Sequence, residues 1–88
     1  MKIIIPSTKF KKDLKRYAKQ PLKMERLLAV IRMLEQEITI PSSFKPHILK
    51  GKYSGCLECH IENDFLLIWI ENDFIELLRL GTHSELFK

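Results

Sequence analysis

The sequence predicts an α+β domain in which a small antiparallel sheet packs one face against a helical hairpin. Apolar residues recur at helical spacing in the first half of the chain, and short β-branched or aromatic runs bounded by turn residues fill most of the second half. The resulting order, β-α-α-β-β-β, puts no helix between the last three strands, which favours hairpin connections over parallel crossovers. We expect residues 1–88 to form a single domain, because a chain of this length builds one modest core.

The N-terminal half is predicted to hold one strand and two helices. Lys2–Ile5 is short and β-branched, and Pro6 ends it, as is typical of an edge strand. Ser7 suits the N-cap of a first helix, whose apolar positions are Phe10, Leu14, Tyr17 and Ala18. Pro21 suits the first turn of a second helix that runs to about Glu37. Its apolar stripe consists of Leu27, Val30, Ile31, Leu34 and Ile38.

The C-terminal half is predicted to hold a loop followed by three strands. Residues 39–52 contain two prolines, paired serines and Gly51, which are typical of a loop. Strands are expected at about 53–61, 65–71 and 74–80, and hairpin-favouring Asn-Asp dipeptides stand between them. Gly81 ends the last strand and a short tail closes the chain.

The sequence predicts no segment that would direct the protein into or across a membrane. Its longest apolar run, Phe65–Ile70, is far shorter than the roughly 20 residues of a membrane span. The apolar stretch at the N-terminus is too short for a signal peptide. We therefore expect a cytoplasmic protein with no membrane partner.

Cys56–His60 matches the C-x-x-C-H pattern of covalent haem attachment, but its context argues against this function. Such attachment requires export, and a strand turns residues three apart to opposite faces, so Cys56 and Cys59 would not converge. The three histidines also lack the short-spaced ligand pairs typical of zinc sites. We expect two buried, reduced thiols, no metal and no cofactor.

Charge is divided unevenly along the chain. Residues 1–50 carry 12 Lys and Arg against 4 Asp and Glu, whereas residues 51–88 carry 3 against 7. The basic half suits a polyanion such as RNA, or an acidic protein partner. All three histidines and most carboxylates lie in or near the other half, which is the pattern expected of a binding surface beside a chemical site.

His47, His60 and His83 each lie beside a strand-like run, so the fold has the means to bring them together. Metal-free RNA cleavage needs a base for the 2′-hydroxyl, an acid for the departing 5′-oxygen and positive charge around the phosphate. Asp64 would orient an imidazole or act as a base, and Lys50 and Arg79 would hold the phosphate. The residues alone also allow the alternative that the three histidines have no catalytic role and only fill surface and core positions.

The chain resembles the YafQ-like branch of the RelE/ParE superfamily, the ribosome-dependent mRNA-cleaving toxins of bacterial toxin–antitoxin pairs. The resemblance covers nearly the whole chain and is strongest in three segments: Phe44–Gly51, Glu58–His60 followed by Asp64–Ile68, and Arg79–Phe87 with its Gly-Thr-His and terminal Leu-Phe. It implies a RelE-like fold and a type II toxin that acts as an endoribonuclease, or mRNA interferase, and inhibits translation.

The resemblance also implies the site. The catalytic positions of the family fall on His47, His60, Asp64 and His83, and Phe87 stands at the terminal aromatic position. We expect His83 and Asp64 to transfer protons while His47 and His60 lie close to the phosphate. The RNA and its phosphates are expected to contact Lys45, Lys50, Phe65, Arg79 and Phe87. Leu57 stands where family members usually carry an arginine, so Arg79 or Lys50 would take more of the phosphate binding.

The implied partners are mRNA, the ribosome through its 16S RNA, and an acidic antitoxin, with operator DNA contacted only through the toxin–antitoxin complex. Two other functions fit the same fold. One is a non-catalytic toxin that inhibits a protein target, as ParE-like toxins do, and the other is a basic RNA-binding module with incidental histidines. Neither of these functions requires the histidine set.

Overall fold

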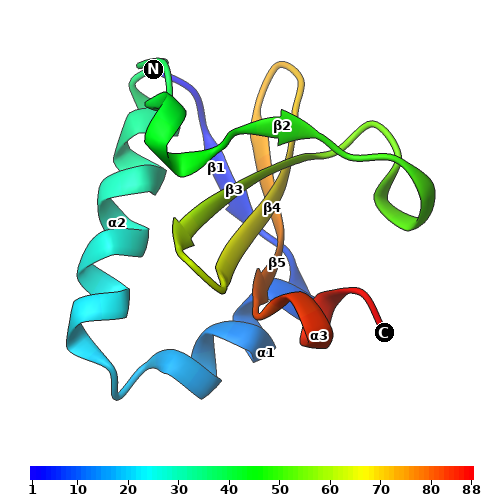
Figure 1. Ribbon diagram of the computed structural model, residues 1–88. Helices are drawn as coiled ribbons and strands as arrows, with labels where there is room; N and C mark the ends of the chain where they lie inside the picture. The colour runs from blue at the N-terminus through cyan, green and yellow to red at the C-terminus, as the bar shows by residue number, and fades with distance from the viewer.

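The computed structural model describes residues 1–88 and shows a five-stranded sheet with helices on both faces (Figure 1). In spatial order the strands are β1 (Ile4–Pro6), β5 (Ile75–Gly81), β4 (Phe65–Glu71), β3 (Leu57–Glu62) and β2 (His47–Ile48). The helices are α1 (Thr8–Tyr17), α2 (Pro21–Glu35) and α3 (His83–Leu86), and two 3₁₀ turns cover Ser42–Phe44 and Gly51–Tyr53. The predicted α+β class is confirmed.

The sheet differs from the prediction at its two edges. β1 is an edge strand as expected, but it runs parallel to β5, while all other neighbours are antiparallel. A short β-branched run does not encode the direction of its neighbour, which is set by the path of the chain. At the other edge, two residues of the predicted loop 39–52 pair with β3 and form the strand β2. A strand of two residues is too short to give a recognisable pattern in the sequence.

The two predicted helices, α1 and α2, begin as predicted and α2 ends slightly earlier, whereas α3 forms in the segment that the sequence predicts to be a tail. The hydroxyl of Ser7 accepts a hydrogen bond from the amide of Phe10 and so caps α1. The second helix ends at Glu35, because Glu37 adopts a left-handed conformation with φ 59°. Ile38 therefore leaves the apolar stripe and is exposed, contrary to the prediction.

The sheet is buried on both faces. On one face α1 and α2 contribute to the main cluster, which includes Cys59, Phe65, Leu67 and Trp69 from β3 and β4. On the other face α3 covers a smaller cluster formed by Leu49, Cys56, Leu66, Ile68 and Leu86. Cys56 and Cys59 thus lie on opposite faces as unpaired buried thiols, as predicted, and burial raises the pKa of Cys59 to about 12. No helix is long and apolar enough to cross a membrane.

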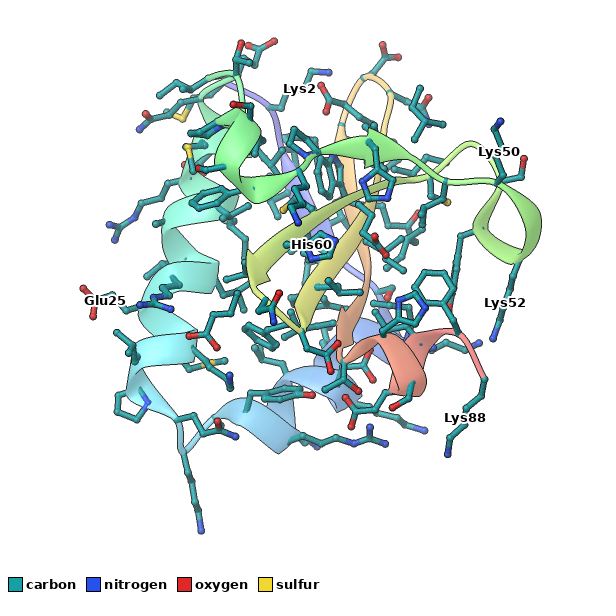
Figure 2. All side chains as sticks on the ribbon, viewed as in Figure 1. Lys2, Glu25, Lys50, Lys52, His60 and Lys88 are labelled. Carbon is teal, nitrogen blue, oxygen red and sulfur yellow. The ribbon has the colours of Figure 1, made fainter.

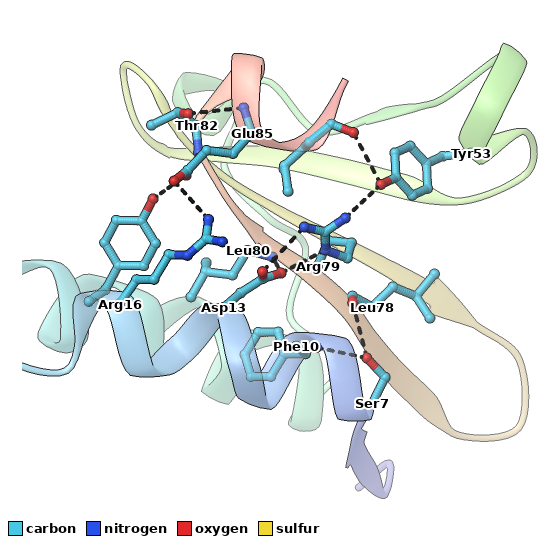
Figure 3. A network of polar contacts seen from close by, with 12 residues as sticks. Ser7, Phe10, Asp13, Arg16, Tyr53, Leu78, Arg79, Leu80, Thr82 and Glu85 are labelled. Atoms are coloured by element: carbon cyan, nitrogen blue, oxygen red, sulfur yellow. Dashed lines mark hydrogen bonds and ion pairs between the residues drawn. The ribbon is translucent and has the colours of Figure 1, made fainter. Parts of the chain in front are cut away.

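A buried carboxylate fixes α1 against β5. Asp13, which is 5% exposed, accepts hydrogen bonds from the Arg79 Nε at 2.7 Å and from the Leu80 amide at 2.9 Å. A second bond joins the Arg79 guanidinium to Oδ1 of Asp13 (Figure 3). Since both side chains are largely removed from water, each depends on the other for its partner.

We expect Asp13→Asn to lower the free energy of unfolding by at least about 2 kcal/mol, because it leaves the Arg79 guanidinium without its counter-charge. Urea unfolding followed by circular dichroism measures the change. Lys12→Gln, a substitution at the exposed neighbouring position, is the matched control and should stay within about 0.5 kcal/mol of the parent chain. Equal stabilities for the two variants would contradict this role of Asp13.

Candidate active site

The face of the sheet that carries α3 brings two histidines to a single carboxylate. Antiparallel pairing places His47 of β2 opposite Glu58 of β3, and Glu58 and His60 are two residues apart on the same face. Oε1 of Glu58 lies 3.1 Å from Nε2 of His47 and 4.0 Å from Nε2 of His60. The two imidazole centroids are 6.3 Å apart. This face of the sheet, where His60 lies over β3, is open toward the viewer in Figure 2.

Both imidazoles are also held from behind by main-chain carbonyls. Nδ1 of His47 lies 2.7 Å from the carbonyl oxygen of Lys45, and Nδ1 of His60 lies 3.2 Å from that of Asn63. Each ring therefore directs Nε2 toward Glu58. The left-handed conformation of Lys45, with φ 51°, is what turns its carbonyl toward the imidazole.

Glu58 belongs to the site although the sequence did not predict it. It is 4% exposed, and its Oε2 has no hydrogen-bond partner. A buried carboxylate is costly unless it is compensated, and the two imidazoles beside Oε1 compensate the charge of Glu58 when they are protonated. The signal was available, because alternation along a strand places Glu58 on the same face as His60.

Asp64 and His83 are joined, although not through the imidazole. Asp64 lies in the two-residue turn between β3 and β4, and its Oδ1 accepts a hydrogen bond of 2.8 Å from the main-chain amide of His83. His83 is the first residue of α3, and its ring stacks on Phe87 with centroids 4.7 Å apart. Asp64 thus fixes the main chain of His83, and the His83 ring rests on an aromatic neighbour.

A second carboxylate, Glu85, anchors α3 and hence His83. Thr82 and Glu85 form a capping box at the start of α3, and Glu85 also accepts bonds from Tyr17 at 2.5 Å and Arg16 at 2.9 Å (Figure 3). A Cβ on Gly81 would lie 2.7 Å from Oε1 of Glu85, so a larger residue here would displace the carboxylate from its present position. The hydrogen bond from Tyr17, followed by that from the Thr82 amide, lowers the pKa of Glu85 to about 2.

Tyr53 connects the site to β5 and was not predicted to do so. Its hydroxyl donates to the carbonyl of Leu86 at 3.2 Å and accepts from Nη1 of Arg79 at 3.2 Å. Its ring meets Phe87 edge to face, with centroids 5.5 Å apart. Arg79, predicted to hold a phosphate, is thereby engaged by Asp13 and Tyr53.

Of the other residues predicted to contact RNA, the two lysines are exposed and the phenylalanine in β4 is buried. Lys45 and Lys50 are exposed and free of acidic partners, with Lys50 on the loop at the rim of the sheet (Figure 2). The prediction that Phe65 contacts RNA is wrong, because this residue is 1% exposed and its ring packs against Tyr17 at 4.7 Å. Phe65 begins the central strand, where both faces are covered.

Comparison with known proteins identifies the family. Residues 2–88 match the model of the bacterial toxin of type II toxin–antitoxin systems, YafQ. The chain belongs to the YafQ toxin family. Its curated relatives include the mRNA interferase toxin YafQ of Escherichia coli strain K12, which is 30% identical over 83 residues, covering 92% of this chain and 90% of the relative.

Solved structures of similar toxins share the fold. YafQ in the Escherichia coli DinJ–YafQ toxin–antitoxin complex has a TM-score of 0.88 at 30% identity, over 99% of this chain and 98% of the other. A metal-bound toxin from Helicobacter pylori has a TM-score of 0.89 at 38% identity, over 99% and 100%. This YafQ-family toxin therefore has the RelE-like fold that its sequence segments imply.

The anchor of α3 makes stability depend on pH in a defined range. Because the pKa of Glu85 is depressed to about 2 from 4.5, its contribution is complete above about pH 4.5 and is lost as the pH falls toward 2. Tyr17→Phe removes the largest cause of this shift. We expect Tyr17→Phe to have a lower free energy of unfolding than the parent chain at pH 7. This difference in free energy, the stability gap, should narrow as the pH falls from 4.5 to 2.

Urea unfolding measured across this pH range provides the test. Tyr53→Phe is the matched control, because it also removes a hydroxyl that holds α3 but one that contacts no carboxylate. Its stability gap should stay constant between pH 4.5 and 2. A constant gap for Tyr17→Phe as well would show that Glu85 is not the titrating group.

Proposed function

We propose that this chain is the toxin of a type II pair and cleaves mRNA on the translating ribosome. The observation that carries the proposal is the orientation of His47 and His60 by the buried Glu58, on the face where Asp64 fixes His83. Ordered, accessible imidazoles are suited to proton transfer near neutral pH, whereas a protein-docking toxin has no need of them. The activity named for the Escherichia coli relative supports the same class.

The proposed reaction uses the 2′-hydroxyl of the substrate as the nucleophile. A base removes its proton, the 2′-oxygen attacks the adjacent phosphorus, and the bond to the 5′-oxygen breaks as an acid protonates that leaving group. The products are a 2′,3′-cyclic phosphate and a 5′-hydroxyl, so protons balance without a cofactor. Positive charge near the phosphate stabilises the additional negative charge of the transition state.

The geometry suggests a division of roles. His83, exposed at the start of α3, would transfer a proton, and Asp64 keeps it in place through Oδ1 while Oδ2 has no partner. His47 and His60 would lie against the phosphate. Glu58 is a positioning residue, since it contacts both imidazoles but is itself buried.

The departure at Leu57 does not leave a gap on this face. Leu57 packs against the main cluster on the side of α1 and α2, opposite to Glu58 and His60. By the same alternation along β3, an arginine at position 57 would also lie on the side of α1 and α2, away from the histidines. Exposed lysines therefore have to supply the phosphate contacts, and Lys45, whose carbonyl already holds His47, is adjacent to the imidazoles.

The proposed regulator is an acidic antitoxin, with operator DNA bound only by the toxin–antitoxin complex. The Escherichia coli relative forms a complex with the antitoxin DinJ. In this chain α1 presents several exposed lysines, including Lys9, Lys11, Lys12 and Lys15, and none of these has an acidic partner. Such a surface favours fast association with an acidic protein.

We expect His83→Ala to abolish growth arrest and to lower mRNA cleavage by roughly 10²–10⁴-fold, because it removes one proton-transfer group. Mapping mRNA 5′ ends after brief induction reports cleavage, codon position and ribosome dependence together. Ser84→Ala, on the same turn of helix, is the control and should retain activity. Full growth arrest by a folded His83→Ala protein, or intact mRNA during arrest by the parent chain, would overturn the assignment.

We also expect cleavage to be independent of a bound transition metal. A Helicobacter pylori relative is metal-bound, but here no three or more His, Cys, Asp or Glu side chains are grouped to hold an ion. Toxin treated with a chelator, then exchanged into magnesium buffer with ribosomes, should cleave at an unchanged rate. Loss of cleavage that zinc or copper restores would contradict this expectation.

A further inference from the structure

The face of the sheet that carries His47, His60 and His83 is called the histidine face below. Beside it lies a hollow of about 450 Å³ whose lining contains no carboxylate. It forms where the start of α1 meets β5 and the 3₁₀ turn Gly51–Tyr53. Two of its lining residues, Lys9 and Lys52, come from segments 43 positions apart in the sequence. Tyr53 and Arg79 form its wall toward the candidate active site.

The lysines of this hollow are unpaired, unlike Lys2 and Lys23. Neither Lys9 nor Lys52 has an acidic group within 4.0 Å, whereas Lys2 pairs with Glu71 and Lys23 pairs with Glu62. Nζ of Lys52 lies over the Tyr53 ring, 5.4 Å from its centroid. The charge of Arg79 is balanced by Asp13, so the two lysines provide the net positive charge.

A second hollow continues the basic surface along α1. It is lined by Lys9, Lys12, Asp13, Arg16 and Arg79, so Lys9 and Arg79 belong to both. Its single carboxylate, Asp13, is turned to Arg79 and the Leu80 amide. Arg16 pairs with Glu85 and Arg79 pairs with Asp13. The two hollows therefore form a track whose uncompensated positive charge comes from Lys52, Lys9 and Lys12.

Tyr53 joins this track to the histidine face. On one side it lines the hollow beneath Lys52, and on the other its ring meets Phe87, on which His83 stacks. Figure 3 shows Tyr53 between Arg79 and the carbonyl of α3. An RNA strand that leaves His83 across Phe87 and Tyr53 would therefore reach Lys52 and Lys9 next.

We propose that the hollow between Lys9 and Lys52 binds a backbone phosphate of the substrate RNA, outside the scissile bond, and so sets the path of the strand through the site. This inference rests on the proposed function, because it takes the strand cleaved at the histidines as its ligand. The contact is to the backbone, so it contributes affinity and register without reading a base.

The test measures binding of a short single-stranded RNA made uncleavable by 2′-deoxy substitution at the cleavage position. Each neutralised phosphate on a single strand contributes about 0.7 to the slope of log affinity against log salt. Because the hollow is proposed to bind one phosphate, the double variant Lys9→Gln/Lys52→Gln should reduce this slope by about 0.7. The control is Lys19→Gln/Arg32→Gln, which removes the same charge from exposed positions outside both hollows and should leave the slope nearly unchanged.

Neutral methylphosphonate linkages then locate the phosphate. One substituted position away from the cleavage site should weaken binding to the parent chain but not to the Lys9→Gln/Lys52→Gln variant. Equal losses in the two double variants, or no position whose effect disappears in the variant, would overturn the proposal. Binding is measured without cleavage, so this outcome is separate from the result for His83→Ala.

Discussion

The constraint on which the structure depends is the burial of β4 on both faces. Phe65, Leu67 and Trp69 face the helices, while Leu66 and Ile68 face the opposite side, and all five are almost fully buried. The second set needs a cover that α1 and α2 cannot provide, because they already occupy the first face. Leu86 of α3 provides it, with 0% exposure. The hydrophobic requirement of one strand thus brings the C-terminus of the chain to the histidine face.

Burial alone would leave a helix of four residues poorly fixed, since so short a segment has little stability of its own. Polar contacts supply the rest. Glu85 ties α3 to α1 through Tyr17 and Arg16, and Asp64 ties its first amide to the turn between β3 and β4. The same bonds that hold the helix determine where His83 stands, so the stability of α3 and the geometry of the site are linked.

The site combines two kinds of support. His83 and Phe87 depend on the docked helix, whereas His47 and His60 depend on strand pairing and on Glu58 between them. Tyr53 connects the two halves with the basic hollow beside α1. The charged groups have two roles. The buried carboxylates of Asp13 and Glu58 orient Arg79 and the imidazoles, and the lysines without acidic partners are exposed, where an RNA backbone has access to them.

The α+β class, the helices α1 and α2, the hairpin turns and the placement of the two cysteines on opposite faces could all be predicted from the sequence, because they follow from local periodicity and turn chemistry. The sequence also pointed to the family through the segments around His47, His60 and His83. It did not reveal the parallel pairing of β1, the burial of Phe65, the engagement of Arg79 by Asp13 or the place of Glu58 between two imidazoles. These features arise in the folded chain, because each depends on which distant segments become neighbours, and local patterns carry no information about that pairing.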